Sequence, residues 1–266
     1  MFQPEKGKRY DMPAAFGPSI YPEVTEVPDA TLISVPFVTT PEAAARLMPK
    51  DFRPAAKPVI YVNRIRYRGV DYLGGRGYEE VLIAVNARYE SSGESIEAPY
   101  IAALWVSECA AILGGREFMG HPKIYGEIPP IVDTDQGHSF EVAEFGNRIL
   151  SASLSELKAL SDETVARIRE KLTPFSFGWK YIAGPAGTVD VDYPTLLKTV
   201  WNYRKAWVGK GTVSFIPRSQ QETPTSWQIV NILAKLPIVE RMPSFMANGA
   251  ATIDRAATRK LRSLRG

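Results

Sequence analysis

Residues 100–128 read YIAALWVSECAAILGGREFMGHPKIYGEI, and this stretch carries the densest structural signal of the chain. Its apolar beginning predicts a strand that ends near residue 106. Ser107-Glu108 then predicts the start of a helix, because serine caps free backbone N–H groups and an acid is stable near the positive end of a helix. We expect this helix of small residues to stop near Gly114-Gly115, which places Lys123 in a loop just beyond it.

Patterns typical of strands lie on both sides of this stretch. Two further helices are expected, a short one that begins at Thr40-Pro41-Glu42 and a longer one over residues 161–172. The helical patterns do not alternate with the strands, which argues against a doubly wound sheet or a TIM barrel. The sequence predicts a β-rich α+β fold, a single domain built on an antiparallel, barrel- or cone-like sheet with a few short helices. The expected strands cover residues 31–38, 59–67, 79–89, 98–106, 139–145, 148–154, 175–182, 199–209 and 211–216.

Length and composition exclude several classes of protein. With 266 residues, of which 45% are hydrophobic, the chain can bury a sizeable core and is not intrinsically disordered. No apolar run approaches the ~18 residues that span a bilayer, and the N-terminus lacks the pattern of a secretory signal. The 32 basic and 29 acidic residues leave a net charge of only +3. We therefore expect a cytoplasmic protein that binds neither a membrane nor a nucleic acid.

Cysteine and histidine are scarce, which limits the kinds of site that the chain can build. Cys109 is the single cysteine, so the sequence excludes an intramolecular disulfide and a multi-cysteine zinc or iron–sulfur site. The two histidines, His121 and His138, offer little material for a metal site or for a histidine-dependent relay. We expect no metal, and a general acid or base that is a carboxylate, a lysine or a tyrosine.

The two ends of the chain differ from its middle. Residues 1–28 contain prolines at positions 4, 13, 18, 22 and 28, each without a backbone donor, and predict an irregular arm that lies on the body of the protein. A partly disordered tail is the alternative. Residues 253–266 are interpreted as a basic C-terminal tail, either solvated or a surface helix. Its basic residues are Arg255, Arg259, Lys260, Arg262 and Arg265.

Lys123 stands in an unusual setting for a lysine. Pro122 precedes it, Ile124-Tyr125 follows it, and Phe118-Met119 lies shortly before it. An apolar environment disfavours a charged ammonium, and an uncharged amine can attack a carbonyl carbon and form a Schiff base. A surface lysine in a proline-containing loop is the other interpretation.

The order strand, helix, Gly115-Arg116-Glu117 and then Pro122-Lys123 resembles the signature of the acetoacetate decarboxylase superfamily. The lysine after the proline is the Schiff-base residue of that family, so the resemblance implies this role for Lys123. The family also has a tyrosine two residues before a functional glutamate, which corresponds here to Tyr78 and Glu80. The resemblance implies a decarboxylase-like domain over residues 29–252.

The sequence departs from the clostridial type of this decarboxylase at two points. That type has a second lysine directly after the first, whereas this chain has Ile124, so burial is expected to activate the amine. That type also has an arginine near the chain start that serves the acid-binding site, and the corresponding position here is Ala30 or close to it. Arg64 and Arg66 are the candidate substitutes that would bind the substrate carboxylate.

Several polar residues are candidates for supporting roles around Lys123. Glu79 and Glu80 lie on one strand and so face opposite sides, and the resemblance favours Glu80 as the inward residue that moves protons, with Glu79 meeting solvent. Arg116 and Glu117 either form an ion pair that fixes the loop or take part in substrate binding. His121 could reach the site, and a packed or exposed histidine is equally compatible with the sequence.

The resemblance implies a lyase that forms a Schiff base with a β-keto acid or a 2-oxo acid, with the Lys123 iminium as the electron sink. An aldolase-dehydratase that condenses pyruvate-like 2-oxo acids with aldehydes on the same lysine is the alternative. A small-molecule binding protein without turnover is the non-enzymatic alternative. Neither reaction needs a cofactor, the expected partner is a small oxo acid, and the family's habit of forming closed oligomers implies a homo-oligomer.

Overall fold

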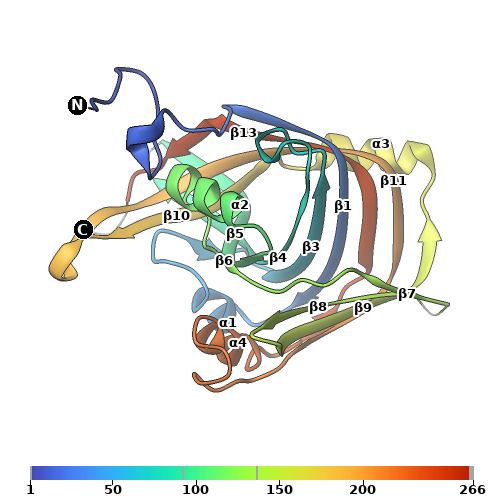
Figure 1. Ribbon diagram of the computed structural model, residues 1–266. Helices are drawn as coiled ribbons and strands as arrows, with labels where there is room; N and C mark the ends of the chain where they lie inside the picture. The colour runs from blue at the N-terminus through green and yellow to red at the C-terminus, as the bar shows by residue number, and fades with distance from the viewer. Residues whose placement is uncertain (1, 92, 136, 264–266) are drawn as a thin grey trace.

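One curved sheet forms the body of the protein (Figure 1). The computed structural model describes residues 2–91, 93–135 and 137–263. Strands follow the order β10-β5-β4-β3-β1-β13-β11, and a further β10–β11 pairing closes the sheet into a barrel. Neighbours in this ring are antiparallel except for the β10–β5 contact. The predicted β-rich α+β domain is therefore confirmed. The ring consists of β1 (Val24–Val38), β3 (Val59–Arg68), β4 (Tyr78–Ser91), β5 (Glu94–Val106), β10 (Phe175–Ala183), β11 (Val189–Phe215) and β13 (Ser244–Lys260).

Strand β11 is long enough to belong to two parts of the sheet. Its first part pairs with β10, and its last part pairs with β9 (Asn147–Ala159), which continues the sheet through β8 (Gly137–Glu144) and β7 (Val132–Thr134). The two strands predicted over residues 199–216 are thus one. Gly211, the first residue of the second predicted strand, serves close packing inside β11, because a Cβ there would lie 2.3 Å from the Ser244 Oγ.

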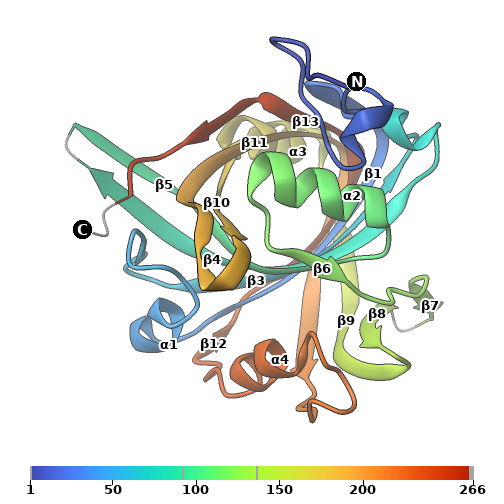
Figure 2. The ribbon, with the colours of Figure 1, turned by 60° about the vertical axis from the view of Figure 1, so that its left-hand side comes forward.

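Helices are short, and those that follow Thr40 and Ser161 begin where expected. The helix predicted to start at Ser107-Glu108 is capped by Glu108 and not by the serine, whose hydroxyl accepts from the Glu79 backbone N–H. The side chains of Thr40, Glu108 and Ser161 accept hydrogen bonds from the first turns of α1, α2 and α3 respectively. Figure 2 shows α2 across the opening of the curved sheet, with β6 running below it. The four α-helices are α1 (Pro41–Ala45), α2 (Cys109–Gly114), α3 (Asp162–Lys171) and α4 (Trp227–Leu233), and the short edge strands are β2 (Arg53–Pro54), β6 (Lys123–Tyr125) and β12 (Glu240–Arg241).

Both faces of β3 and β4 are buried, which gives the domain two apolar layers. On β4, Leu82 and Ala84 face the interior of the barrel. Val81, Ile83 and Val85 face the other layer, where side chains from β8, β9 and α4 cover them. This double burial explains why residues 81–85 are uniformly apolar rather than alternating. The two layers differ in packing, because the inner layer surrounds a cavity whereas the outer layer is a packed core.

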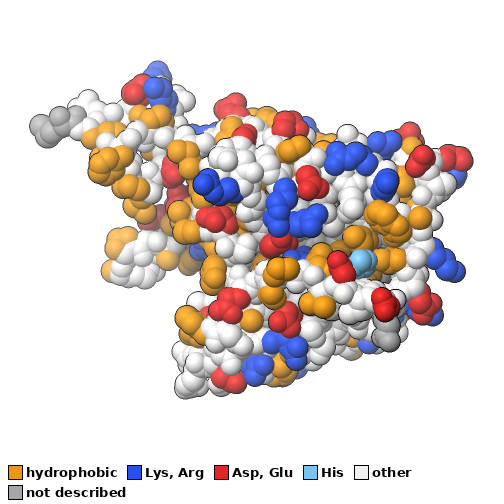
Figure 3. All heavy atoms as spheres, turned by 45° about the vertical axis from the view of Figure 1, so that its right-hand side comes forward, with side chains coloured by type: hydrophobic (Ala, Val, Ile, Leu, Met, Phe, Trp, Pro, Cys, Tyr) orange, Lys and Arg blue, Asp and Glu red, His pale blue; other side chains and the backbone are white. Residues whose placement is uncertain are grey.

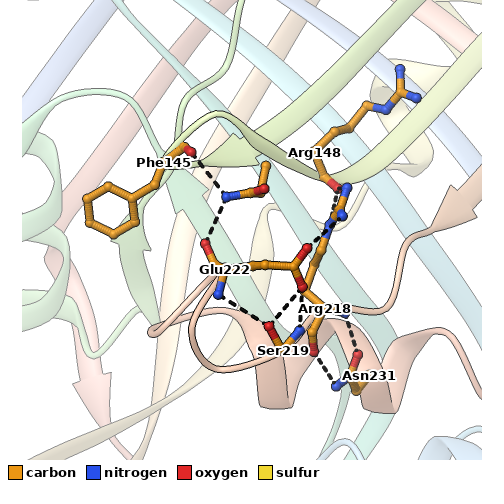
Figure 4. Close-up of polar contacts among 7 residues, drawn as sticks. Phe145, Arg148, Arg218, Ser219, Glu222 and Asn231 are labelled. Carbon is orange, nitrogen blue, oxygen red and sulfur yellow. Dashed lines mark hydrogen bonds and ion pairs between the residues drawn. The ribbon is translucent and has the colours of Figure 1, made fainter.

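A polar cluster holds the segment that leads into α4, a helix that the sequence analysis missed (Figure 4). The Arg218 guanidinium donates to the Arg148 carbonyl oxygen and pairs with Glu222 at 3.2 Å. The Asn231 side-chain amide accepts from the Arg218 backbone N–H and donates to its carbonyl oxygen. Backbone and side-chain hydrogen bonds from Ser219 to Glu222 complete a cap-like turn, so polar contacts fix the segment from which the helix starts, and Val230 and Leu233 bury its apolar face.

The predicted boundaries of the two chain ends are wrong in part. Strand β1 begins at Val24, so the last five residues of the predicted arm, 24–28, belong to the sheet. Strand β13 continues to Lys260, with Arg255 and Leu261 buried, so residues 253–260 form neither a solvated tail nor a surface helix. Burial of every second residue in a strand explains both results. Residues 264–266 of the predicted tail, with Arg265, lie outside the described part of the chain.

Charged side chains of both signs are interspersed over the face drawn in Figure 3, as the balanced composition leads one to expect. Among the helices that the structure describes, not one has both the length and the apolar character needed to cross a membrane.

Candidate active site

Lys123 and Glu80 form a buried ion pair on the inside of the barrel. The Lys123 Nζ lies 3.2 Å from the Glu80 Oε2, and the two side chains are 6% and 7% exposed. Tyr67 donates a hydrogen bond of 3.4 Å from its hydroxyl to the other carboxylate oxygen. Lys123 is the first residue of β6, which pairs in parallel with the end of β5, rather than part of a loop as predicted. The structure therefore brings together the two residues that the sequence analysis singled out first.

The glycines before Lys123 make room for its side chain. A Cβ on Gly115 would lie 2.6 Å from the Lys123 Cδ, so only glycine lets the lysine stem pass this point. Gly115 also begins a π-helical turn that ends at Met119, and Gly120 follows in the left-handed region with φ 79°. Arg116 is exposed, and its guanidinium donates a hydrogen bond of 3.0 Å to the Lys123 carbonyl oxygen. These features fix where the lysine enters the barrel.

Glu79 lies on the opposite face of β4 and is not a solvated charge. Its carboxylate pairs with Arg64 at 3.1 Å and with Arg68 at 3.0 Å. The Arg64 side chain is only 2% exposed and also donates to the Pro129 carbonyl oxygen. The expectation that Glu79 meets solvent is therefore wrong, because the second apolar layer covers this face of the sheet.

Arg64 and Arg66 do not face the interior of the barrel, so the structure does not support them as binders of a substrate carboxylate. Arg64 pairs with Glu79 in the outer layer, and Arg66 donates a hydrogen bond of 3.1 Å to the Thr31 hydroxyl. Strand alternation explains this placement, since the inward residues of β3 are its odd-numbered ones.

The ion pair lines a cavity of 710 Å³ inside the barrel. Tyr67, Tyr78 and His121 lie around the pair, and the Lys123 Nζ lies 5.4 Å from the centre of the Tyr78 ring. Burial, with the nearby Glu80 carboxylate, raises the pKa of both tyrosines well above 10. Their hydroxyls therefore stay protonated at neutral pH, which lets Tyr67 keep donating its hydrogen bond to Glu80.

His121 lines the same cavity as a neutral imidazole. Burial, together with the positive charges of Lys123 and Arg255, holds the pKa of His121 well below its ordinary value of 6.5. The Nδ1 atom is buried and has no hydrogen-bond partner among the described residues. Since a neutral imidazole carries one donor and one acceptor nitrogen, one of these two functions of His121 is left without a partner inside the described part of the protein.

The sequence analysis missed two polar residues of this cavity, Tyr67 beside Glu80 and the cation Arg255. Arg255 is 7% exposed, and its guanidinium donates to the Thr25 hydroxyl at 2.7 Å and to the Pro22 carbonyl oxygen at 3.2 Å. Its charge lies 5.1 Å from the centre of the Tyr72 ring. Among the described residues no carboxylate forms an ion pair with Arg255, and its Nε has no partner. The only signal for Arg255 in the sequence was its two-residue spacing from the apolar Ile253, which the surrounding basic residues obscured.

Two other candidates lie outside the cavity. Glu117 does not line it and forms no ion pair with Arg116 in the described part of the chain, so the predicted loop-fixing pair is absent. Ile124 packs against the outer apolar layer, on the face of β6 opposite Lys123. Within the described residues, no cluster of three or more His, Cys, Asp or Glu side chains is arranged to hold a metal ion.

Comparisons with known proteins agree on the family of this fold. A family model described as acetoacetate decarboxylase matches residues 11–252. A search of curated proteins found no match. A structure from structural studies of acetoacetate decarboxylase superposes with a TM-score of 0.77 at 14% identity, covering 95% of both chains. Acetoacetate decarboxylase from Legionella pneumophila gives 0.73 at 20% identity, covering 91% of this chain and 88% of the other.

A third structure is that of the enduracididine biosynthesis enzyme MppR, complexed with the condensation product of pyruvate and imidazole 4-carboxaldehyde. It superposes with a TM-score of 0.68 at 16% identity, covering 96% of this chain and 97% of that one. At such identities the solved structures establish the fold alone, and the family model establishes the family.

Proposed function

Because the chain belongs to the acetoacetate decarboxylase family, we propose that it is a lyase that forms a Schiff base between Lys123 and a β-keto acid or a 2-oxo acid. The observation that carries the proposal is the buried Lys123–Glu80 pair, 3.2 Å apart, on the wall of a cavity large enough for a substrate. A buried amine with a proton acceptor beside it is the arrangement that attack on a carbonyl requires.

The first half of the reaction uses both members of the pair. Glu80 accepts a proton from the Lys123 ammonium, and the free amine adds to the substrate carbonyl carbon to give a carbinolamine. Protonation of the carbinolamine hydroxyl by the Glu80 carboxyl, which holds the proton taken from the ammonium, expels water and leaves an iminium. The positive nitrogen then draws electrons from the adjacent carbon atoms of the substrate.

The second half depends on the substrate. With a carboxylate β to the iminium carbon, the bond to the carboxylate breaks, carbon dioxide leaves and an enamine remains. Protonation of the enamine carbon and hydrolysis then release the ketone and restore Lys123. With a pyruvate-like acid, Glu80 takes a proton from the carbon next to the iminium and produces an equivalent enamine.

An aldolase-dehydratase reaction is the second candidate, and the size of the cavity favours it. The enamine formed from a 2-oxo acid would attack an aldehyde carbon, and loss of water would give an unsaturated oxo acid still bound as the iminium. A cavity of 710 Å³ has room for two reactants. The likeness to MppR, whose bound molecule is a condensation product, points the same way.

Borohydride trapping tests the proposed chemistry. We expect reduction in the presence of a panel of β-keto and 2-oxo acids to add the mass of the reduced substrate to the peptide that contains Lys123. The adduct forms because the iminium is reduced to a stable secondary amine. Mass spectrometry of the digested protein locates it, and analysis of the products without borohydride separates decarboxylation from condensation. Absence of an adduct with every carbonyl compound would favour the binding-protein alternative.

Arg255 is proposed to bind the substrate carboxylate, since it is a buried cation without a carboxylate partner in the wall that also carries Lys123. We expect Arg255→Met to lower kcat/KM for an oxo acid by roughly 10- to 100-fold, the effect of losing one hydrogen bond to a charged group. The loss should appear mainly in KM, and Arg255→Lys should recover part of it. Trapping of an uncharged ketone should be unaffected.

Arg259→Met is the matched control, because Arg259 lies on the same strand but pairs with Glu94 on the surface. Equal losses for the oxo acid and the uncharged ketone in Arg255→Met would show that Arg255 only supports the fold. Steady-state kinetics with both substrates and the folded fraction measured by circular dichroism separate these outcomes.

A further inference from the structure

The cavity continues well beyond the Lys123–Glu80 pair. Four successive inward residues of β3, Tyr61, Asn63, Ile65 and Tyr67, all line it. At ~3.4 Å per residue the wall from Tyr61 to Tyr67 spans about 20 Å. The pair lies at the Tyr67 end, and Ala84, which is paired with Tyr61, lines the far end. The chamber is therefore much longer than a three- or four-carbon oxo acid.

Charge is confined to the two ends of this chamber. The charged lining residues Glu80, Lys123 and Arg255 are buried and lie at the reacting end. The other two charged lining residues, Glu97 and Lys171, are exposed to solvent. They mark the opening of the chamber, which we call the mouth. A molecule that fills the chamber thus meets cations and a carboxylate at its inner end, an uncharged, mainly apolar and aromatic wall that includes Asn63 along its length, and solvent at its outer end.

The wall between the two ends is a continuous row of aromatic rings. Tyr67 stacks on Trp201 with ring centres 6.1 Å apart, Trp201 lies 5.7 Å from Tyr203, and Tyr203 lies 5.7 Å from Phe245. Trp201 and Phe245 are only partly buried although they point into the barrel. Large apolar side chains that remain uncovered inside a cavity indicate an apolar ligand, because their burial would stabilise the complex.

We propose that the substrate is an oxo acid with a long apolar arm, an acyl chain or an aryl group, that lies along the Tyr67–Trp201–Tyr203–Phe245 wall. This inference rests on the proposed Schiff-base function and names the class of substrate for the same site. The oxo-acid head reaches Lys123, and the arm extends toward the mouth. Cavities of ~300–1,000 Å³ typically hold drug-sized molecules, which matches a volume of 710 Å³.

A homologous series of straight-chain oxo acids tests the proposal. With the wild-type protein, each methylene that enters the chamber should raise kcat/KM by about fourfold, the value that corresponds to ~0.8 kcal/mol per buried CH₂. Ala84→Phe places a ring in the far part of the chamber. It should abolish the gain for the longer chains, so that their kcat/KM no longer exceeds that of the shortest substrate in the same variant.

One further variant serves as a control, and another replaces Ala84→Phe if that variant does not fold. Val200→Phe adds the same ring on the exposed outer face of β11 and should keep the full gain with chain length. If Ala84→Phe does not fold, Phe245→Ala answers the same question, because loss of part of the wall should reduce the gain per methylene. If the wild-type kcat/KM does not rise with chain length while short oxo acids are still trapped on Lys123, the proposal of a long apolar arm is wrong. The proposed Schiff-base chemistry is then unaffected. Failure of trapping with the whole series overturns the proposed function itself.

Discussion

Replacing Lys123 with methionine is expected to abolish turnover of every oxo acid, and borohydride trapping with it, in a protein that still folds. Methionine keeps an unbranched stem that can pass Gly115, so the packing at the entry to the barrel is preserved. The variant has no amine to form an iminium, and without an iminium the substrate has no electron sink. Steady-state kinetics, intact-protein mass spectrometry and circular dichroism measure the three parts of this expectation.

Lys123→Arg is the matched control for charge. A guanidinium keeps a cation beside Glu80 but stays protonated at any working pH, so it cannot act as the nucleophile. Both variants should therefore be equally inactive. The outcome that contradicts the assignment is an adduct of undiminished yield on another lysine. The first to inspect is Lys180, whose pKa burial lowers from its ordinary value and which lies close to Gly120.

Glu80→Gln is expected to lower turnover by ~10²–10⁴-fold, the usual contribution of a general acid–base residue. The amide can still contact Lys123 but cannot accept its proton or return one to the enamine carbon. Trapping should fall less than turnover, because the amine that forms the iminium remains. The ratio of trapping rate to turnover rate, measured on the same preparation, separates loss of proton transfer from loss of the nucleophile.

Glu79→Gln removes the same charge from the neighbouring residue and tests a different property. It leaves Arg64 buried without its carboxylate, a change that typically costs 3–5 kcal/mol of unfolding free energy, so we expect lower stability to urea with per-molecule activity retained. Glu80→Gln should show the reverse pattern, with activity lost and a smaller effect on stability. A larger loss of per-molecule activity in Glu79→Gln than in Glu80→Gln would contradict the role proposed for Glu80.

Period-two alternation is what made much of this architecture predictable. It located β3, whereas β-branched and apolar runs indicated β1, β4 and β5. It also separated Glu79 from Glu80, because adjacent residues of a strand must face opposite sides. The alternation does not reveal which side a second layer covers. Glu79 and Arg64 were therefore assigned to solvent or to the substrate, although the other apolar layer buries both.

Other features depended on contacts between segments far apart in the sequence. Arg255 appeared to belong to a basic tail because its neighbours are charged, and only pairing of β13 with β1 and β11 turns its side chain into the barrel. Strand β11 was predicted as two strands, and the close approach of Gly209 and Gly211 to other strands, which fits them to a continuous strand, is invisible locally. A polar cluster fixes the turn before α4, and the helix buries Val230 and Leu233 against the outer apolar layer. This seven-residue helix is too short for its apolar spacing to have identified it from the sequence.

The order in which the barrel strands occur along the chain has a consequence for folding. β1 lies between β3 and β13 in the sheet, yet more than 200 residues separate β1 from β13 in the chain. Pairings of such long sequence separation form slowly, because the entropy of loop closure opposes them. The cavity is therefore not enclosed until residues 244–260 have paired with β1 and β11. Until then the interior surface is open to solvent and prone to aggregation.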